Sequence, residues 1–69
     1  MKRFFPLKIK QRRKAMGLSQ VELARLCSIS NIALCCIERG RKTPRTETLL
    51  RISSALGTDL DYFFVESAN

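Results

Sequence analysis

The stretch Ser19–Gly40, SQVELARLCSISNIALCCIERG, decides the fold of this chain. It opens with Ser-x-x-Glu, formed by Ser19 and Glu22. This pattern is a capping box, in which each side chain accepts a hydrogen bond from the other residue's free backbone N–H. Leu23 and Cys27 follow on one helical face, one turn apart. The stretch therefore begins with a short helix that buries one side.

A turn and a second helix come next. Ile29 is expected to fill the corner, and Ser30 can cap the following helix with its side-chain oxygen. Leu34 and Ile37 then face inward, and Gly40 is typical of a left-handed residue just past a helix end. Two helices joined in this way at a steep angle form a helix-turn-helix, whose second helix enters the DNA major groove in proteins that use it.

These residues resemble the Cro/CI-type (XRE-like) helix-turn-helix family, found in phage repressors and small bacterial regulators. The similarity continues through TETLLRISSALGTDLDYFF and so covers about residues 7–64. It implies an all-α, lambda-repressor-like domain of five helices. The ordered residues that carry it are Gln20, Leu23-Ala24, Ile29-Ser30, Ile37-Glu38-Arg39-Gly40 and Ala55-Leu56-Gly57.

The apolar spacing and the helix-ending glycines predict where these five helices lie. They cover about residues 7–16, 20–27 and 31–39, then Thr43-Pro44 to Leu56, and a short last helix that starts near Thr58. Residues 1–6 are expected to form a basic tail and residues 65–69 a C-terminal tail, with no strand. The predicted core is Ile9, Met16, Leu18, Leu23, Ala24, Cys27, Ile29, Leu34, Ile37, Leu49, Ile52, Leu56, Leu60 and Phe63.

Length and composition limit the class of protein. Sixty-nine residues suit one domain, and no apolar run is long enough for a membrane span. MKRFFPLK lacks the apolar stretch of a signal peptide, so we expect a cytoplasmic location. Cys27, Cys35 and Cys36 are an odd number and no His is present. Free thiols are therefore favoured over a disulfide or a zinc site.

The charge distribution favours a polyanionic partner. The net charge is +7, and all but one of the 13 Lys and Arg residues precede residue 46, whereas most of the six acidic residues follow it. A basic half beside a mildly acidic half suits a protein with one face on nucleic acid. The alternatives are a solvated basic surface or attraction to anionic lipid.

The resemblance implies how bases would be read. Asn31, Ile32 and Cys36 match positions from which the family reads bases, and Cys35 lies at the margin. An Asn can bond adenine N6 and N7 together, and Ile32 would touch thymine methyl groups. The alternative for Ile32 is packing against a neighbouring side chain. Because a thiol hydrogen-bonds weakly, we expect reliance on methyl contacts and DNA shape.

The resemblance also implies phosphate contacts. The family's glutamine at the position of Gln20 bonds a phosphate and braces the recognition helix. The expected phosphate-binding residues are Ser19, Gln20, Ser30, Arg39, Arg41, Lys42 and Arg45. The alternative for the cations after residue 38 is that they only aid solubility.

Two further positions concern structure. Arg13 resembles the arginine that pairs with the glutamate ending the recognition helix, here Glu38, and we expect a structural ion pair between them. Ser28 stands where the family usually has a turn glycine. The other cations of the first helix, Lys8, Lys10, Arg12 and Lys14, are expected to point mostly to water.

These observations favour a homodimeric repressor that binds a palindromic operator in double-stranded DNA. The expected dimer interface is apolar and poor in Lys and Arg: Leu60, Tyr62, Phe64 and Val65. The alternative for Phe64 is that it folds back on the first helix of a monomer. The alternative function is an antitoxin that neutralises a toxin and regulates its own promoter, and an anti-repressor is another candidate small protein partner.

Enzymatic activity is not expected. The sequence has no His, no paired-carboxylate site and no phosphate-cradling glycine loop, and no base accompanies the cysteines. Neither a cofactor, nor a metal, nor a small-molecule substrate is therefore expected.

Overall fold

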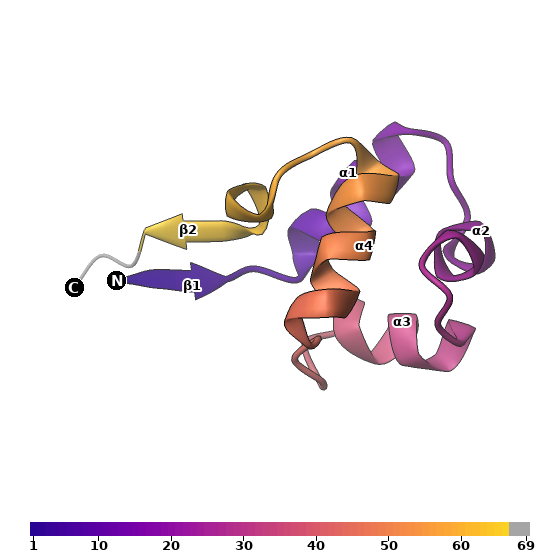
Figure 1. The fold of residues 1–69 in the computed structure, drawn as a ribbon, viewed down its shortest axis with the longest axis horizontal. Helices are drawn as coiled ribbons and strands as arrows, with labels where there is room; N and C mark the ends of the chain where they lie inside the picture. The colour runs from indigo at the N-terminus through magenta and orange to yellow at the C-terminus, as the bar shows by residue number, and fades with distance from the viewer. Residues whose placement is uncertain (67–69) are drawn as a thin grey trace.

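The computed structural model describes residues 1–66 as four α-helices, a short 3-10 helix and a two-stranded antiparallel sheet (Figure 1). Residues 67–69, the end of the predicted C-terminal tail, lie outside the described residues. The elements in chain order are β1 (Lys2–Phe4), α1 (Leu7–Ala15), α2 (Gln20–Leu26), α3 (Asn31–Glu38), α4 (Thr46–Leu56), η1 (Leu60–Phe63) and β2 (Phe64–Glu66).

The helix-turn-helix forms as its capping residues predict. The Ser19 hydroxyl accepts from the Glu22 backbone N–H at 3.0 Å, and the Glu22 carboxylate accepts from the Ser19 N–H at 2.7 Å. The hydrogen bonds from Ser19 lower the pKa of Glu22. The Ser30 hydroxyl accepts from the Ala33 N–H at 3.0 Å and so starts α3. The axes of α2 and α3 bend by 109° at the turn, which is the steep angle of this motif.

The core lies where α1, α2 and α3 surround α4 (Figure 1). Met16 was expected there but is 43% exposed, because α1 ends at Ala15 and turns Met16 outward as its C-cap. Leu18, Ile29 and Leu60 are half-buried and pack against the core from its edge. The buried apolar residues are Ile9, Leu23, Ala24, Cys27, Leu34, Ile37, Leu49, Ile52, Leu56 and Phe63.

Both ends of the described chain form strands, which corrects the expectation of tails and of no strand. β1 pairs with β2 so that Arg3 lies opposite Val65 and Phe4 opposite Phe64. The Phe5 N–H extends the pairing by donating to the Phe63 carbonyl at 2.7 Å. The rings of Phe4 and Phe64 lie 5.7 Å apart. This contact between distant residues stabilises strands of only three residues.

The predicted fourth and fifth helices also differ. The fourth begins two residues beyond Pro44, with Arg45 as an extended N-cap that makes no side-chain capping bond. The fifth is not an α-helix but the 3-10 helix η1, capped by the Asp59 side chain, which accepts from the Tyr62 N–H at 3.1 Å. This tighter turn places Phe63 in the core just before the chain extends into β2.

The cysteines are free thiols in different surroundings. Cys27 is fully buried, and burial raises the pKa of its thiol. Within residues 1–66, no three Cys, Asp or Glu side chains gather in a way that could hold a metal ion. No single helix there is long and apolar enough to cross a membrane, and only the bent pair of α2 and α3 meets those criteria jointly.

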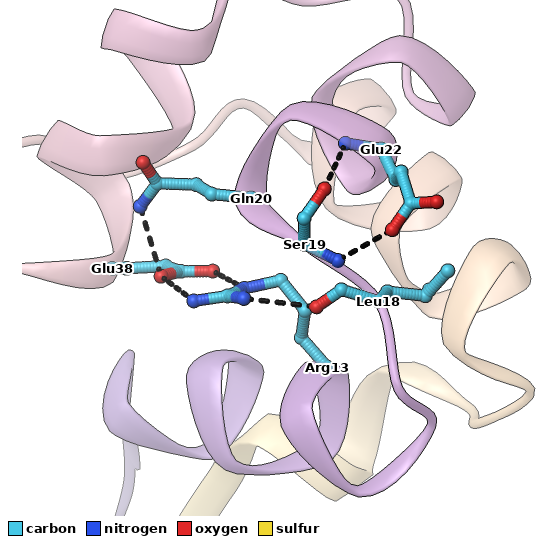
Figure 2. Close-up of polar contacts among 6 residues, drawn as sticks. All are labelled: Arg13, Leu18, Ser19, Gln20, Glu22 and Glu38. Carbon is cyan, nitrogen blue, oxygen red and sulfur yellow. Dashed lines mark hydrogen bonds and ion pairs between the residues drawn. The ribbon is translucent and has the colours of Figure 1, made fainter.

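A buried ion pair joins α1 to α3 (Figure 2). Arg13 Nε donates to Glu38 Oε2 at 2.8 Å, and Arg13 Nη2 donates to Glu38 Oε1 at 3.1 Å. Arg13 Nη1 also donates to the Leu18 carbonyl at 3.0 Å, which fixes the chain just before α2. The pair expected from the sequence is therefore present, and its bidentate geometry gives direction as well as charge.

Two other cations of α1 do not point to water as expected. Arg12 Nε donates to the Leu56 carbonyl at 3.0 Å and so satisfies the end of α4. Lys8 Nζ lies 5.0 Å from the centre of the Tyr62 ring, within the range of a cation–π contact. These contacts tie α1 to α4 and to η1.

A substitution at Ser28 can test whether the backbone is strained in the turn between α2 and α3. Its φ is +58°, a left-handed conformation that disfavours any residue with a Cβ. Ser28→Gly should therefore raise the free energy of unfolding by up to about 1 kcal/mol, less than the full strain because glycine is more flexible when unfolded. Urea unfolding followed by circular dichroism measures the change.

Gly17→Ala is the matched control for that measurement. Gly17 has φ +74° and its added Cβ would meet nothing within 4 Å, so the substitution reports backbone strain without a steric clash, with the same unfolded-state offset as at Ser28. It should lower the free energy of unfolding by about 1 kcal/mol. A destabilised Ser28→Gly beside a destabilised Gly17→Ala would contradict the strain at Ser28.

Breaking the buried ion pair should destabilise the fold strongly. Arg13→Leu leaves the Glu38 carboxylate buried without its cation, and the free energy of unfolding should fall by about 3–5 kcal/mol. Arg51→Leu breaks the exposed Arg51–Glu47 pair and should change it by about 1 kcal/mol or less. Thermal melts of both variants test the contrast. Equal losses would refute it, and an Arg13→Leu/Glu38→Leu double variant should recover stability.

Candidate nucleic-acid interface

The outer face of α3 is free of neighbours at its start. Asn31 is exposed, and Ile32 is 76% exposed, so Ile32 does not pack against a neighbouring side chain as the alternative supposed. Cys36, one turn further along, is half-buried. Leu34 and Ile37 on the opposite side are buried in the core and fix the rotation of the helix. This arrangement presents a short amide and a branched apolar side chain outward.

The start of α2 lies beside the end of α3. The half-buried Gln20 donates from Nε2 to Glu38 Oε1 at 3.2 Å, so the glutamine braces the buried ion pair (Figure 2). The oxygens of Ser19 and Ser30 accept from their own helices, which leaves both hydroxyl hydrogens free to donate outward. The starts of α2 and α3 thus carry polar side chains that are held in place by local hydrogen bonds and still have donors to offer.

The loop after α3 carries four exposed cations. Gly40 is left-handed at φ +76°, and the next N–H, that of Arg41, donates to the Cys36 carbonyl at 2.9 Å. Lys42 and Arg45 line a cavity of about 240 Å³ whose floor includes Ile29, Ala33 and Ile37. Arg39, Arg41, Lys42 and Arg45 are therefore exposed cations between the C-terminal end of α3 and the start of α4.

Sequence reasoning missed two lysines on the other side of α3. Lys10 and Lys14 line a cavity of about 370 Å³ between α1 and α3, together with Arg39, Gln20 and Cys35. The sequence could have predicted this position. Lys10 and Lys14 are four residues apart, so they share a side of the helix, and they flank Arg13, whose partner is on α3. Cations therefore border the face of α3 on two sides, which makes this surface attractive to a polyanion.

The residues expected at a dimer interface lie at the other end of the molecule. Tyr62 is 38% exposed, but Phe64 and Val65 are half-buried, because β1 pairs with β2 and places Phe4 against Phe64. Phe64 thus packs on β1, neither fully exposed nor folded onto α1. Leu60 and Phe64 line a groove of about 190 Å³ with Phe4, Pro44 and Leu49. The four residues expected at the interface, Leu60, Tyr62, Phe64 and Val65, thus lie together at the end formed by η1 and β2. The apolar surface that they expose is smaller than expected.

Comparison with known proteins identifies relatives among phage regulators. The ImmF control region 10 kDa protein of Bacillus phage phi105 is 42% identical over 53 residues, which are 77% of this chain and 59% of that protein. Repressor protein C2 of Salmonella phage P22 is 36% identical over 55 residues, 80% of this chain and 26% of that protein. The matches thus span 59% and 26% of these two relatives.

Solved structures and a family model agree with these relatives. The P22 c2 repressor in complex with a synthetic operator superposes with a TM-score of 0.83 at 33% identity, covering 88% of this chain and 92% of that one. SinR in complex with DNA superposes with a TM-score of 0.79 at 32% identity, covering 84% and 97%. The helix-turn-helix family model HTH_3 matches residues 9–63. The chain belongs to the HTH_3 helix-turn-helix family.

Proposed function

We propose that this protein is a sequence-specific double-stranded DNA-binding transcriptional regulator, acting as a repressor, with α3 in the major groove. The observation that carries the proposal is the exposed start of α3, with Ile32 at 76% exposure, together with the cations that border the rest of this helix on two sides. The relatives named as a control-region protein and a repressor support it, as does the solved P22 c2 repressor bound to its operator.

In this proposal the first turn of α3 reads the bases. The Asn31 amide offers both a donor and an acceptor and suits an adenine edge. Ile32 supplies an apolar contact for thymine methyl groups. Cys36, with Cys35 at the margin, adds close packing but weak hydrogen bonds. We therefore expect an operator in which A·T pairs matter near Ile32 and DNA shape matters elsewhere.

Phosphate contacts would hold α3 in register. Gln20 already bonds Glu38, so its amide is oriented before DNA arrives, and it retains a second N–H that can donate to phosphate. The exposed cations after α3 would bind the backbone further along the same strand. The full proposed set is Ser19, Gln20, Ser30, Arg39, Arg41, Lys42 and Arg45.

The proposal includes a homodimer on a palindromic operator. One short helix reads only a few base pairs, and two-fold pairing places two such helices about 34 Å apart, one turn of DNA. The end of the molecule around η1 and β2 offers the exposed Tyr62 and the apolar groove beside Leu60 and Phe64. This groove shares no lining residue with the cavity of Lys10 and Lys14, although Pro44 lines both this groove and the cavity of Lys42 and Arg45. The antitoxin alternative gains no specific support from the described residues.

Binding selection from random duplex DNA, followed by sequencing, tests the function itself. We expect a palindromic consensus whose half-sites are separated by one helical turn, because the dimer would present its recognition helices at that spacing. A non-palindromic consensus would remove the dimer but keep the DNA-binding function. Recovery of no consensus at moderate salt would contradict the proposed function.

Ile32→Ala and Arg41→Ala should weaken DNA binding in different ways. Loss of the Ile32 side chain should reduce discrimination by about 1–3 kcal/mol at one position per half-site, because a base contact is lost. Arg41→Ala should weaken binding to all sequences alike and reduce the log–log salt slope by about 0.9 for each lost phosphate contact. Titrations of specific and mismatched duplexes separate the two. A uniform loss for Ile32→Ala would refute its reading role.

Tyr62→Asp should separate two copies without unfolding either. Phe64 is a poorer position for this test because its ring is half-buried against Phe4, whereas Tyr62 is 38% exposed and its ring contacts Lys8 and Phe63. Because a charge is unfavourable at an apolar interface, the variant should sediment with a lower mass and should lose most of its affinity for a palindrome. Tyr62→Phe is the matched control and should keep both. A wild type that sediments as a monomer at high concentration and binds without cooperativity would contradict the dimer.

A further inference from the structure

The cavity between α1 and α3 contains a thiol among cations. Cys35 lines this cavity of about 370 Å³ together with Lys10, Lys14 and Arg39. The one carboxylate in its lining, that of Glu38, is already bonded to Arg13 and Gln20. Three cationic residues and one cysteine therefore line a single cavity whose volume lies in the range of small-ligand sites.

The three cysteines differ in how far a reagent can reach them. Cys27 is fully buried and burial raises its pKa, which keeps its thiol protonated and unreactive. Cys35 and Cys36 are half-buried and free. Adjacent cysteines within an intact helix cannot readily bridge each other, so Cys36 does not consume the Cys35 thiol in an internal disulfide. Cys35 is the one of the three that borders the cationic cavity.

We propose that Cys35 is a modification site for small anionic disulfides, and that its mixed disulfide blocks DNA binding. This inference rests on the proposed function for its regulatory half. In the exchange, the Cys35 sulfur attacks one sulfur of the reagent, the reagent's S–S bond breaks and a new S–S bond to Cys35 forms. The other half of the reagent leaves as a thiolate and takes the proton that Cys35 releases. The cysteine is oxidised and the leaving half is reduced.

The cations select the charge of the reagent. Lys10, Lys14 and Arg39 raise the local concentration of an anion over that of a neutral or cationic molecule. Carboxylates carried by the reagent can then remain beside these side chains after the sulfur bond has formed. An acidic disulfide is therefore favoured both in approach and in the product.

The adduct would compete directly with DNA. Gln20 lines the same cavity, and its amide is proposed to donate to a phosphate. A bound carboxylate there would neutralise the cations and repel the phosphate, as other charge-changing modifications do at anion sites. The added bulk also lies against α3 beside the proposed reading face. Reduction by a thiol would reverse both effects.

The chemical half is tested on the full chain with oxidised glutathione as the probe. Intact-mass spectrometry and peptide mapping should find one adduct, on Cys35, which Cys35→Ser abolishes and Cys36→Ser retains. Cystamine, a cationic disulfide, should react several-fold more slowly relative to a urea-unfolded sample of the same chain. Lys10→Gln/Lys14→Gln should remove that preference. No adduct on Cys35, or equal relative rates for the two reagents, would overturn the proposal.

The regulatory half of the proposal is tested by measuring affinity for the operator found by binding selection. Each protein is compared with its own untreated sample. Glutathione treatment should lower the affinity of the wild type by at least about tenfold, with recovery in dithiothreitol. The same treatment should leave the affinity of Cys35→Ser within about twofold of its untreated value. A Cys35 adduct that binds DNA as tightly as the untreated protein would overturn the regulation. Failure of untreated wild type to bind any operator would instead contradict the proposed function, while the mass readout still tests the modification.

Discussion

The orientation of α3 depends on one buried carboxylate. The two oxygens of Glu38 accept from Arg13 on α1 at 2.8 and 3.1 Å and from Gln20 on α2 at 3.2 Å. A charge with this little solvent contact is tolerated only when its partners are in place, so partial displacement of any of the three helices is unfavourable. The network therefore fixes the angle at which α3 leaves the body, although it need not add much net stability.

Local signals made the helix-turn-helix predictable. The capping box of Ser19 with Glu22 and the N-cap of Ser30 act within three residues, and the left-handed glycines each end a helix through short-range backbone bonds. The period of the apolar residues then identified the buried faces of α2, α3 and α4. The resemblance supplied what spacing alone does not, namely the pairing of Arg13 with Glu38 across 25 positions of sequence.

Features that depend on tertiary contact were not predictable. Strands of three residues have too few positions to show alternation, and Phe4 and Phe64 become neighbours only after the helices have folded. Met16 fits the apolar period of α1, yet the helix ends one residue earlier and turns it outward. In the sequence, Lys10 and Lys14 look like ordinary solvent-facing lysines. Only the folded structure shows that they line a cavity with residues of α3.

The pairing of β1 with β2 gives the molecule two tiers of cooperativity. The contacts among the four α-helices span at most moderate separations, such as the 44 positions between Arg12 and Leu56, whereas the sheet joins residues from opposite ends of the described chain. Closing so long a loop carries the largest entropy penalty of any contact here, and it is opposed by a few hydrogen bonds, one aromatic contact and two exposed ion pairs. The β1–β2 sheet should therefore form last during folding. Its backbone N–H groups should exchange first in native-state hydrogen exchange, while those of the helices stay protected.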